Sequence, residues 1–482
     1  MTEQKEKKSK YQALEEKLLY KNDSIWQSIS HSEENEMSNI SNEYMDYISK
    51  CKTERESVIY LQNKAINAGY KNILDFKGKA KTNDKFYWNF RDKVLAIIKI
   101  GEDINFNNGI NIVGAHSDSP RLDLKQNPLY EDSGFALFKT HYYGGIKKYQ
   151  WLNIPLALHG VVILENGKKI EINIGEKDDD PVFVISDLLP HLSRNVQGDK
   201  KISEAISAEN MVVIVGSRPV KDKLVKEKVK LYVLEYLYNN YGIKEEDFIS
   251  SEIEVVPAFK AREIGFDRSI IGAYGHDDRV CSYLAVSSLI SNSNIKKTGV
   301  ALIVDKEEIG SSGSTGSDSY FIHHLYSIIA NAINGENLSF SDLRKSFLNS
   351  NCISSDVAAA INPPYKQVHD LQNAAKLGYG VAITKYTGSG GKYSANDADA
   401  EYVGKIRGLL NSHKIPWQYA MLGKVDEGGG GTIAKYVAYY GINTIDAGVP
   451  VVGMHSPFEL ISKADLWATY KFYSSFFAEF LV

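Results

Sequence analysis

The sequence predicts an α/β protein in which a strand-rich segment interrupts a domain built from helices and a mixed sheet. Three features of its 482 residues support this prediction: a helix-like N-terminal region, a strand-rich middle third, and alternating strands and helices toward the C-terminus. A chain of this length favours two or three domains, or one domain with a large insertion.

Residues 1–75 are rich in Lys, Glu and Leu, and their apolar positions recur at the spacing that predicts helices. From about Val94 the pattern changes to short apolar runs that end in turn residues. The runs "VLAIIKI" (94–100) and "INIVGAHSDSP" (110–120) are typical of strands. The N-terminal helices are therefore followed directly by the first strands of a sheet.

The middle third is rich in strand patterns. The run "GVVILENGKKIEINIG" (160–175) predicts a hairpin whose turn is Asn166-Gly167. "MVVIVGS" (211–217) and "EIEVVPAFKARE" (252–263) also read as strands, and a helix is expected near 222–239. We interpret residues 127–262 as a domain inserted into an α/β domain formed by residues 1–126 and 263–482.

After Gly275 helices and strands alternate. The run "RVCSYLAVSSLI" predicts a helix, "GVALIVD" a strand, and a further helix follows "GSTGSDS". More such pairs continue to the C-terminus. This alternation is typical of an α/β sheet covered by helices.

The composition is that of a globular protein with a real core, since 43% of the residues are hydrophobic and 24% are charged. The formal net charge of -4 gives no electrostatic reason to expect a nucleic-acid or membrane partner. The three cysteines form no CxxC pair, which fits a reducing compartment. Residues 1–21 lack the apolar core of a signal peptide, and no apolar run approaches the ~20 residues that span a bilayer. We expect a cytoplasmic protein.

Acids and histidines stand at the ends of several apolar runs, where open α/β sheets bind ligands. They are His116, Asp118, Asp277, Asp278, Asp305, Glu307, Glu308, Asp356 and His455. Each has an ordinary structural alternative: a surface turn, a solvated helix face, a helix N-cap or a structural histidine. Taken together, these structural alternatives are less convincing than a shared ligand site, because two imidazoles and several carboxylates would lie at one sheet edge. Such mixed nitrogen and oxygen ligands suit Zn²⁺, and Co²⁺ or Mn²⁺ is possible.

The same segments resemble the motifs of a known family. Residues 116–120, 305–311, 355–358 and 454–456 are similar to the motifs of the M18 metallopeptidases, the aspartyl aminopeptidases, and with Asp277 they stand in that family's order. Residues 143–145, 190–192, 430–433 and 445–448 match as well. The resemblance runs from about residue 85 to the end of the chain.

The resemblance implies two metal ions per subunit, bridged by Asp277. His116 and Asp356 would hold one ion, and Glu308 and His455 the other. Asp118 would orient His116 through its second ring nitrogen. Glu307 would be the general base. The fold implied is therefore a two-metal peptidase domain that carries an inserted dimerisation domain.

The activity implied is hydrolysis of the N-terminal residue from peptides with a free N-terminus, by water that two divalent ions activate. Lys385 falls where the family has a lysine suited to an acidic substrate side chain, so a preference for Asp or Glu is expected; a solvated strand-end lysine is the alternative. The family also implies a homo-oligomer, a dodecamer built from dimers. His191 resembles a family segment near a subunit contact.

The sequence departs from the family pattern beside the bridging acid, where Asp278 replaces the usual Asn. This leaves open whether Asp277 or Asp278 bridges, and alignment favours Asp277. The rival functions are an N-acyl amino acid deacylase on the same scaffold, an aminopeptidase of broad or neutral specificity, and a non-catalytic scaffold. A dinucleotide-dependent oxidoreductase would use the glycines of 429–434 with Asp446. The sequence has no GxSxG and no phosphate-binding P-loop.

Overall fold

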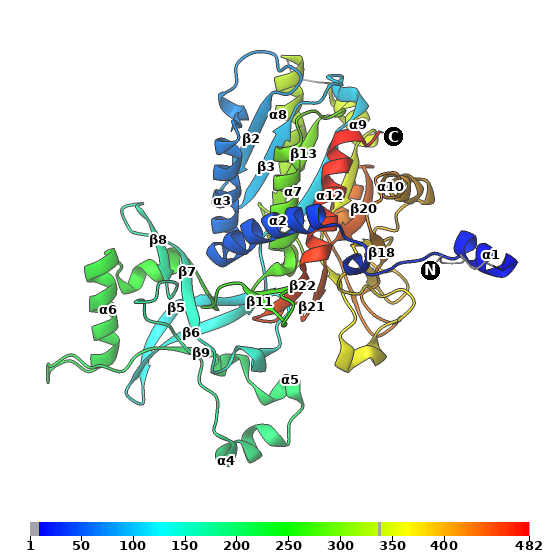
Figure 1. Cartoon of the computed structure of the whole chain (residues 1–482). Helices are drawn as coiled ribbons and strands as arrows, with labels where there is room; N and C mark the ends of the chain where they lie inside the picture. Colours follow the sequence, from blue (N-terminus) through cyan, green and yellow to red (C-terminus); the bar gives the residue numbers. More distant parts are fainter. Residues whose placement is uncertain (1–8, 336–338, 482) are drawn as a thin grey trace.

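The computed structural model describes residues 9–335 and 339–481, and a nine-stranded sheet forms the centre of the molecule (Figure 1). Its strand order is β1-β2-β3-β13-β4-β14-β20-β16-β18. The four central strands β13, β4, β14 and β20 run parallel, while β3 and β16 pair with this group antiparallel. The prediction of a mixed α/β sheet is confirmed. The strands are β1 Lys71–Asn72, β2 Lys85–Phe90, β3 Val94–Lys99, β4 Asn111–His116, β13 Gly299–Val304, β14 Asn351–Ser354, β16 Val381–Thr384, β18 Trp417–Tyr419 and β20 Asn443–Gly448.

The central strands are buried on both faces, which explains why they read as continuous apolar runs. Successive side chains of β4 enter different cores: Val113 and Ala115 face one, and Ile112 faces the other. Helices α2 His31–Lys50, α3 Glu54–Asn67, α7 His276–Ser291, α10 Ala400–Ser412 and α12 Lys463–Glu479 complete the first core. Helices α8 Phe321–Asn334, α9 Phe340–Leu348 and α11 Ala434–Ala438 complete the second.

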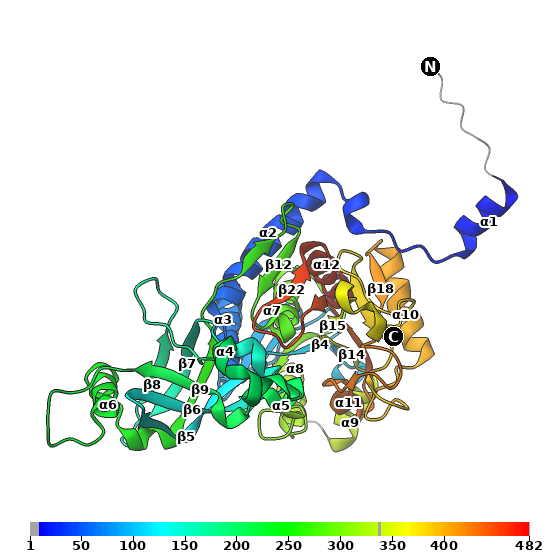
Figure 2. The ribbon, with the colours of Figure 1, turned by 90° about the horizontal axis from the view of Figure 1, so that it is seen from below.

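A six-stranded antiparallel sheet lies beside this body and has its own core (Figure 2). Its order is β8-β7-β10-β5-β6-β9. The expected hairpin at Asn166-Gly167 is confirmed as the β7–β8 pair. Because β5 starts at Arg121, the expected boundary at residue 127 falls inside a strand. The elements are β5 Arg121–Asp132, β6 Phe135–Tyr143, β7 Leu156–Ile163, β8 Lys169–Ile174, α4 Pro190–Ser193, α5 Ile202–Ala205, β9 Val212–Gly216, α6 Lys228–Tyr241 and β10 Ser251–Pro257.

A five-stranded sheet, in the order β11-β12-β22-β21-β15, joins segments from the C-terminal half. Its antiparallel β12–β22 pair places the start of α7 next to the loop between β21 and β22. Both regions contribute to the site described below. The strands are β11 Arg262–Ile264, β12 Ile270–Ala273, β15 Ala358–Ala359, β21 Pro450–Val452 and β22 Glu459–Ser462.

From residue 9 onward the N-terminal region is mainly helical as expected, and residues 1–8 of that prediction lie outside the described residues. Helix α1, Lys10–Leu18, extends away from the body (Figure 1), whereas α2 and α3 pack on it. Within residues 9–335 and 339–481, every helix is too short or too polar to cross a bilayer.

Candidate metal centre

The acids and histidines singled out in the sequence converge because the strands that carry them are neighbours. Strand β4 ends at His116, and β13 and β14 lie parallel to it on either side. Glu307 and Glu308 follow β13, and Asp356 follows β14. The carboxyl ends of parallel strands meet at one sheet edge, so these side chains face a common space.

The Asp277 carboxylate lies between two imidazoles. Its Oδ1 is 3.3 Å from Nε2 of His116, and its Oδ2 is 3.2 Å from Nε2 of His455. Asp277 belongs to the first turn of α7, where its ψ of 108° departs from helical geometry. Asp278 makes a different contact with His116, since its Oδ2 accepts the backbone N–H of that residue at 3.4 Å.

Each imidazole has a further carboxylate beside it. Oδ2 of Asp356 lies 3.8 Å from Nε2 of His116, and Oε1 of Glu308 lies 3.4 Å from Nε2 of His455. Two groups of three possible ligands share His116: one with Asp277 and Glu308, the other with Asp278 and Asp356. All five residues expected to hold metal are therefore together, and Asp278 lies close enough to join them.

The electrostatics of this cluster favour a bound cation. Burial and the neighbouring Asp277 raise the pKa of Glu308 well above its usual value. Burial opposes the charged form of His455, but the Asp277 carboxylate raises the pKa of this imidazole to about 10. Oε1 of Glu308 is buried and makes no hydrogen bond within the described part of the chain. Two imidazoles and several carboxylates, one with an unused oxygen, are a donor set that suits zinc.

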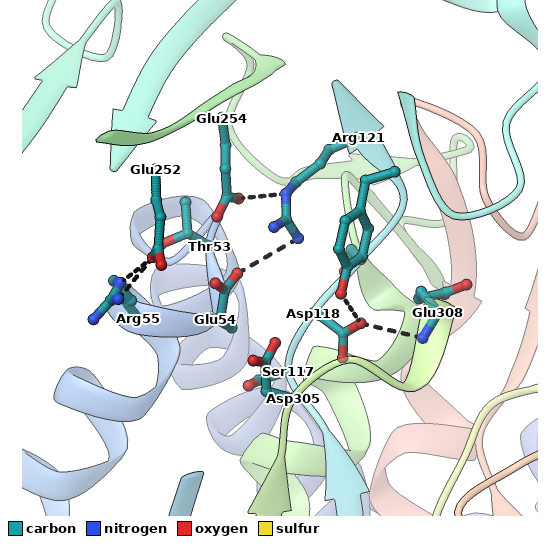
Figure 3. A network of polar contacts seen from close by, with 12 residues as sticks. Thr53, Glu54, Arg55, Ser117, Asp118, Arg121, Glu252, Glu254, Asp305 and Glu308 are labelled. Atoms are coloured by element: carbon teal, nitrogen blue, oxygen red, sulfur yellow. Dashed lines mark hydrogen bonds and ion pairs between the residues drawn. The ribbon is translucent and has the colours of Figure 1, made fainter. Parts of the chain in front are cut away.

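Asp118 contacts both His116 and the segment that carries Glu307 and Glu308. Nδ1 of His116 lies 3.0 Å from the backbone carbonyl oxygen of Asp118 and 3.3 Å from its Oδ1, and the carboxylate accepts the backbone N–H groups of Glu307 at 3.2 Å and Glu308 at 3.1 Å. Figure 3 shows its contact with Glu308. The hydroxyl of Tyr143 also donates to Asp118, at 2.8 Å. One buried carboxylate thus holds both an imidazole and the short 3₁₀ turn Glu307–Ile309.

Glu307 faces the cavity. Burial is the main reason that its pKa is raised to about 8, and the nearby Asp356 and Asp118 add to the effect against the opposing charge of His116. Asp305, by contrast, is engaged by Lys306 at 2.5 Å and by the Thr315 hydroxyl at 2.6 Å. Among the described residues, Asp305 is the acid after β13 that forms an ion pair with its sequence neighbour, Lys306, whereas Glu307 and Glu308 line the cavity.

The site opens into a cavity of about 800 Å³. The histidines and acids line this cavity together with residues of the β17–β19 pair, Gly388–Ser389 with Gly429–Gly430. Because Gly429 and Gly430 lie in a separate two-stranded sheet and do not follow a strand of the nine-stranded sheet, the dinucleotide interpretation is wrong. Lysines among the lining residues are Lys392, Lys424 and Lys435.

Lys385 and His191 lie apart from the converging residues. The Lys385 ammonium is 2.8 Å from Oδ1 of Asp397 and 45% exposed, and it is not among the described residues that line the cavity. Lys392, which lines it, contacts the other oxygen of Asp397 at 2.7 Å. His191 is exposed on the short helix α4 of the second sheet's long loop.

Sequence reasoning missed two contributors to the site. Glu459 accepts the backbone N–H groups of His455 at 2.6 Å and Asp277 at 3.0 Å. Gly145 places its carbonyl oxygen 2.8 Å from Nδ1 of His455. Glu459 stands four residues after His455 at the start of a strand, which gave no local signal. Gly145 lay in a segment matched to the family without a role.

A buried set of imidazoles and carboxylates at the edge of an α/β sheet, open to a cavity, defines a metal-dependent hydrolase. Comparison with known proteins specifies the family. The model of the aminopeptidase I zinc metalloprotease family (M18) matches residues 47–477. The chain belongs to this family and is an M18 aminopeptidase, so the resemblance seen in the sequence is confirmed.

Relatives and solved structures agree with this assignment. A probable M18 family aminopeptidase 1 of Thermotoga maritima is 51% identical over 446 residues, covering 92% of this chain and 97% of the relative. One of Borreliella afzelii is 49% identical over 455 residues, covering 94% and 99%. The crystal structure of an M18 aminopeptidase from Thermotoga maritima superposes with a TM-score of 0.91 at 49% identity, covering 96% of this chain and all (100%) of that one. The yeast mApe1 dodecamer shares the fold at 21% identity and a TM-score of 0.73, covering 92% and 97%.

Proposed function

We propose that this aminopeptidase uses two metal ions, held on either side of Asp277, to remove the N-terminal residue of peptides. The observation that supports this most directly is the position of the Asp277 carboxylate between the imidazoles of His116 and His455. His116 and Asp356 would hold one ion, and Glu308 and His455 the other. When bound, the ions lower the pKa of the attacking water and polarise the scissile carbonyl. The family description names zinc, and the same donors would accept Co²⁺ or Mn²⁺.

Glu307 is the proposed general base. Its carboxylate faces the cavity, and Asp118 holds its backbone. Glu307 would take a proton from the water and deliver it to the leaving amine. Asp118 would keep His116 in the tautomer that presents Nε2 to the metal, because its backbone carbonyl oxygen and its carboxylate both lie at Nδ1.

The proposed preference is for N-terminal Asp or Glu, and the cavity supplies cations for it. Lys392, Lys424 and Lys435 line the cavity and could attract a substrate carboxylate. Lys385 and Lys392 both contact Asp397, so either ammonium would need to leave it to bind a substrate carboxylate. We place the weight of this proposal on Lys392 because it lines the cavity, where its ammonium also lies over the face of Tyr386.

The second sheet is the proposed dimerisation domain, and a dodecamer built from dimers is the proposed assembly. The yeast mApe1 dodecamer, which shares the fold, supports this. The long loop between β8 and β9 also exposes apolar side chains, among them Leu189, Leu192 and Ile202. Exposed apolar side chains gathered in this way are typical of a protein interface. Light scattering coupled to gel filtration tests the assembly, and a monomer at micromolar concentration would contradict it.

A substrate panel tests the reaction. Aminoacyl p-nitroanilides and short peptides, with and without chelator and with Zn²⁺, Co²⁺ or Mn²⁺ restored, should give chelator-sensitive release led by Asp and Glu. Release led by Leu or Met would keep the mechanism and reject the acidic preference. Cleavage of N-acylated but not free aminoacyl substrates would instead indicate a deacylase.

A further inference from the structure

The end of strand β6, in the second sheet, lies close to both histidines of the candidate metal centre, His116 and His455. The Tyr143 hydroxyl donates to Oδ2 of Asp118 at 2.8 Å, and Asp118 in turn contacts Nδ1 of His116 through its backbone carbonyl oxygen at 3.0 Å and through Oδ1 at 3.3 Å. Two residues later, the carbonyl oxygen of Gly145 lies 2.8 Å from Nδ1 of His455. Residues 143–145 therefore contact Nδ1 of His455 directly and reach Nδ1 of His116 through Asp118.

The Tyr143 ring is held from its other side. The guanidinium of Arg121, its partner across the β5–β6 pair, lies 3.9 Å from the ring centroid. Arg121 is buried and fixed by Glu254 at 3.1 Å and Glu54 at 3.5 Å, as Figure 3 shows. Glu54 begins helix α3 of the main body, and Glu254 lies on β10. The tyrosine is therefore clamped where the second sheet meets the main body.

Two glycines after Tyr143 permit this close approach. A Cβ atom on Gly144 would lie 3.3 Å from Cβ of Glu308, and its φ of +69° already disfavours a side chain. A Cβ atom on Gly145 would lie 3.4 Å from Nδ1 of His455. The backbone of 144–145 thus lies against one carboxylate and one imidazole of the cluster.

We propose that residues 143–145 are positioning residues for the metal centre, so that the second sheet sets the orientation of both histidines. This rests on the metal-binding roles proposed above for His116 and His455. A hydrogen bond at the second ring nitrogen fixes the tautomer and the ring plane of a metal-binding histidine. The second sheet, expected from the sequence to be an assembly domain, therefore also contributes to metal affinity.

The first test replaces Tyr143 with Phe, which keeps the ring over Arg121 and removes only the hydroxyl. Metal-free full-length protein is titrated with Zn²⁺ in competition with a chromophoric chelator. Tyr143→Phe should weaken zinc binding by about tenfold. This is the lower end of the range for loss of a group that supports a metal-binding side chain. At saturating zinc, kcat should fall while KM stays unchanged. Tyr142→Phe, at the exposed neighbouring position, is the control and should match the unaltered protein in both measurements.

A second pair of variants keeps the proposal testable if Tyr143→Phe folds poorly. Gly144→Ala should weaken zinc binding because its methyl group would press on Glu308. Gly134→Ala, in the β5–β6 turn, is the matched control: its φ of +81° imposes the same backbone cost, and nothing lies within 4 Å of the added carbon. Equal zinc affinity in this pair, together with normal affinity and kcat in Tyr143→Phe, would overturn the proposal.

The zinc stoichiometry of the unaltered protein separates this proposal from the proposed mechanism. If it binds one ion per chain, the two-ion mechanism fails, yet the affinity ratio between variant and unaltered protein still decides the role of 143–145. Thermal unfolding of the metal-free proteins completes the comparison, because a merely structural role would lower the melting temperature of the variants without a separate loss of zinc affinity.

Discussion

The Glu459 carboxylate accepts the backbone N–H of Asp277 at 3.0 Å, although 182 residues separate the two in the chain. Its other oxygen accepts the N–H of His455 at 2.6 Å. One buried acid therefore fixes the backbone at two proposed metal-binding positions, which come from different strand connections. This relationship leads to the first prediction.

Glu459→Gln should weaken zinc binding by about tenfold, as is usual when a group that hydrogen-bonds to metal-binding residues is lost. The glutamine amide can present only one oxygen, so it would turn N–H groups toward one of the two backbone amides. Zinc content after dialysis against a weak chelator, measured by mass spectrometry, is the readout. Glu479→Gln, on the exposed end of α12, serves as the control. Full zinc retention in Glu459→Gln would remove the positioning role.

Glu307→Gln should lose activity by about 10²- to 10⁴-fold, the usual contribution of a general base, while its zinc content stays unchanged. The amide is nearly the same size as the acid, and none of the proposed metal contacts depends on this side chain. Parallel kinetics and elemental analysis check both halves of the prediction. A fully active variant would show that another group takes the proton.

Lys392→Ala should lower kcat/KM for Asp and Glu substrates by about tenfold or more relative to Leu substrates, since loss of a charged hydrogen bond costs about 1.5–3 kcal/mol. Lys385→Ala, the matched variant, should have the smaller effect because its ammonium lies on Asp397 outside the cavity lining. Competition assays with mixed peptides give the ratio directly. The reverse order would return the specificity role to Lys385, and equal losses on all substrates would exclude both lysines from it.

Removal of the metal ions should lower the melting temperature as well as abolish activity. Without a cation, burial first and the neighbouring Asp277 carboxylate second disfavour the charged forms of Asp356 and Glu308, and both raise the pKa of these acids. Zinc at a thousand times its dissociation constant stabilises the folded state by about 4 kcal/mol. Differential scanning calorimetry with chelator, followed by zinc addition, measures the shift and its reversal. An unchanged melting temperature after confirmed metal loss would mean that the site contributes nothing to stability.

Much of the site could be predicted from sequence because its residues stand in local context. His116, Glu308 and Asp356 each follow an apolar strand, and neighbouring parallel strands end at the same sheet edge. The strand and helix pattern likewise predicted the mixed sheet and the β7–β8 hairpin, since apolar periodicity and an Asn-Gly turn act over a few residues.

Only the tertiary structure decided which groups support these residues. The placement of Asp277 rather than Asp278 between the imidazoles depends on how the chain enters α7. The contacts of Glu459, Tyr143 and Gly145 join segments that are distant in the chain, and the pairing of Lys385 with Asp397 depends on a side-chain direction. Local patterns determine where a strand ends and which chemistry follows it. Packing between strands and sheets determines which groups contact each proposed metal-binding residue, because those distances are set by the whole fold.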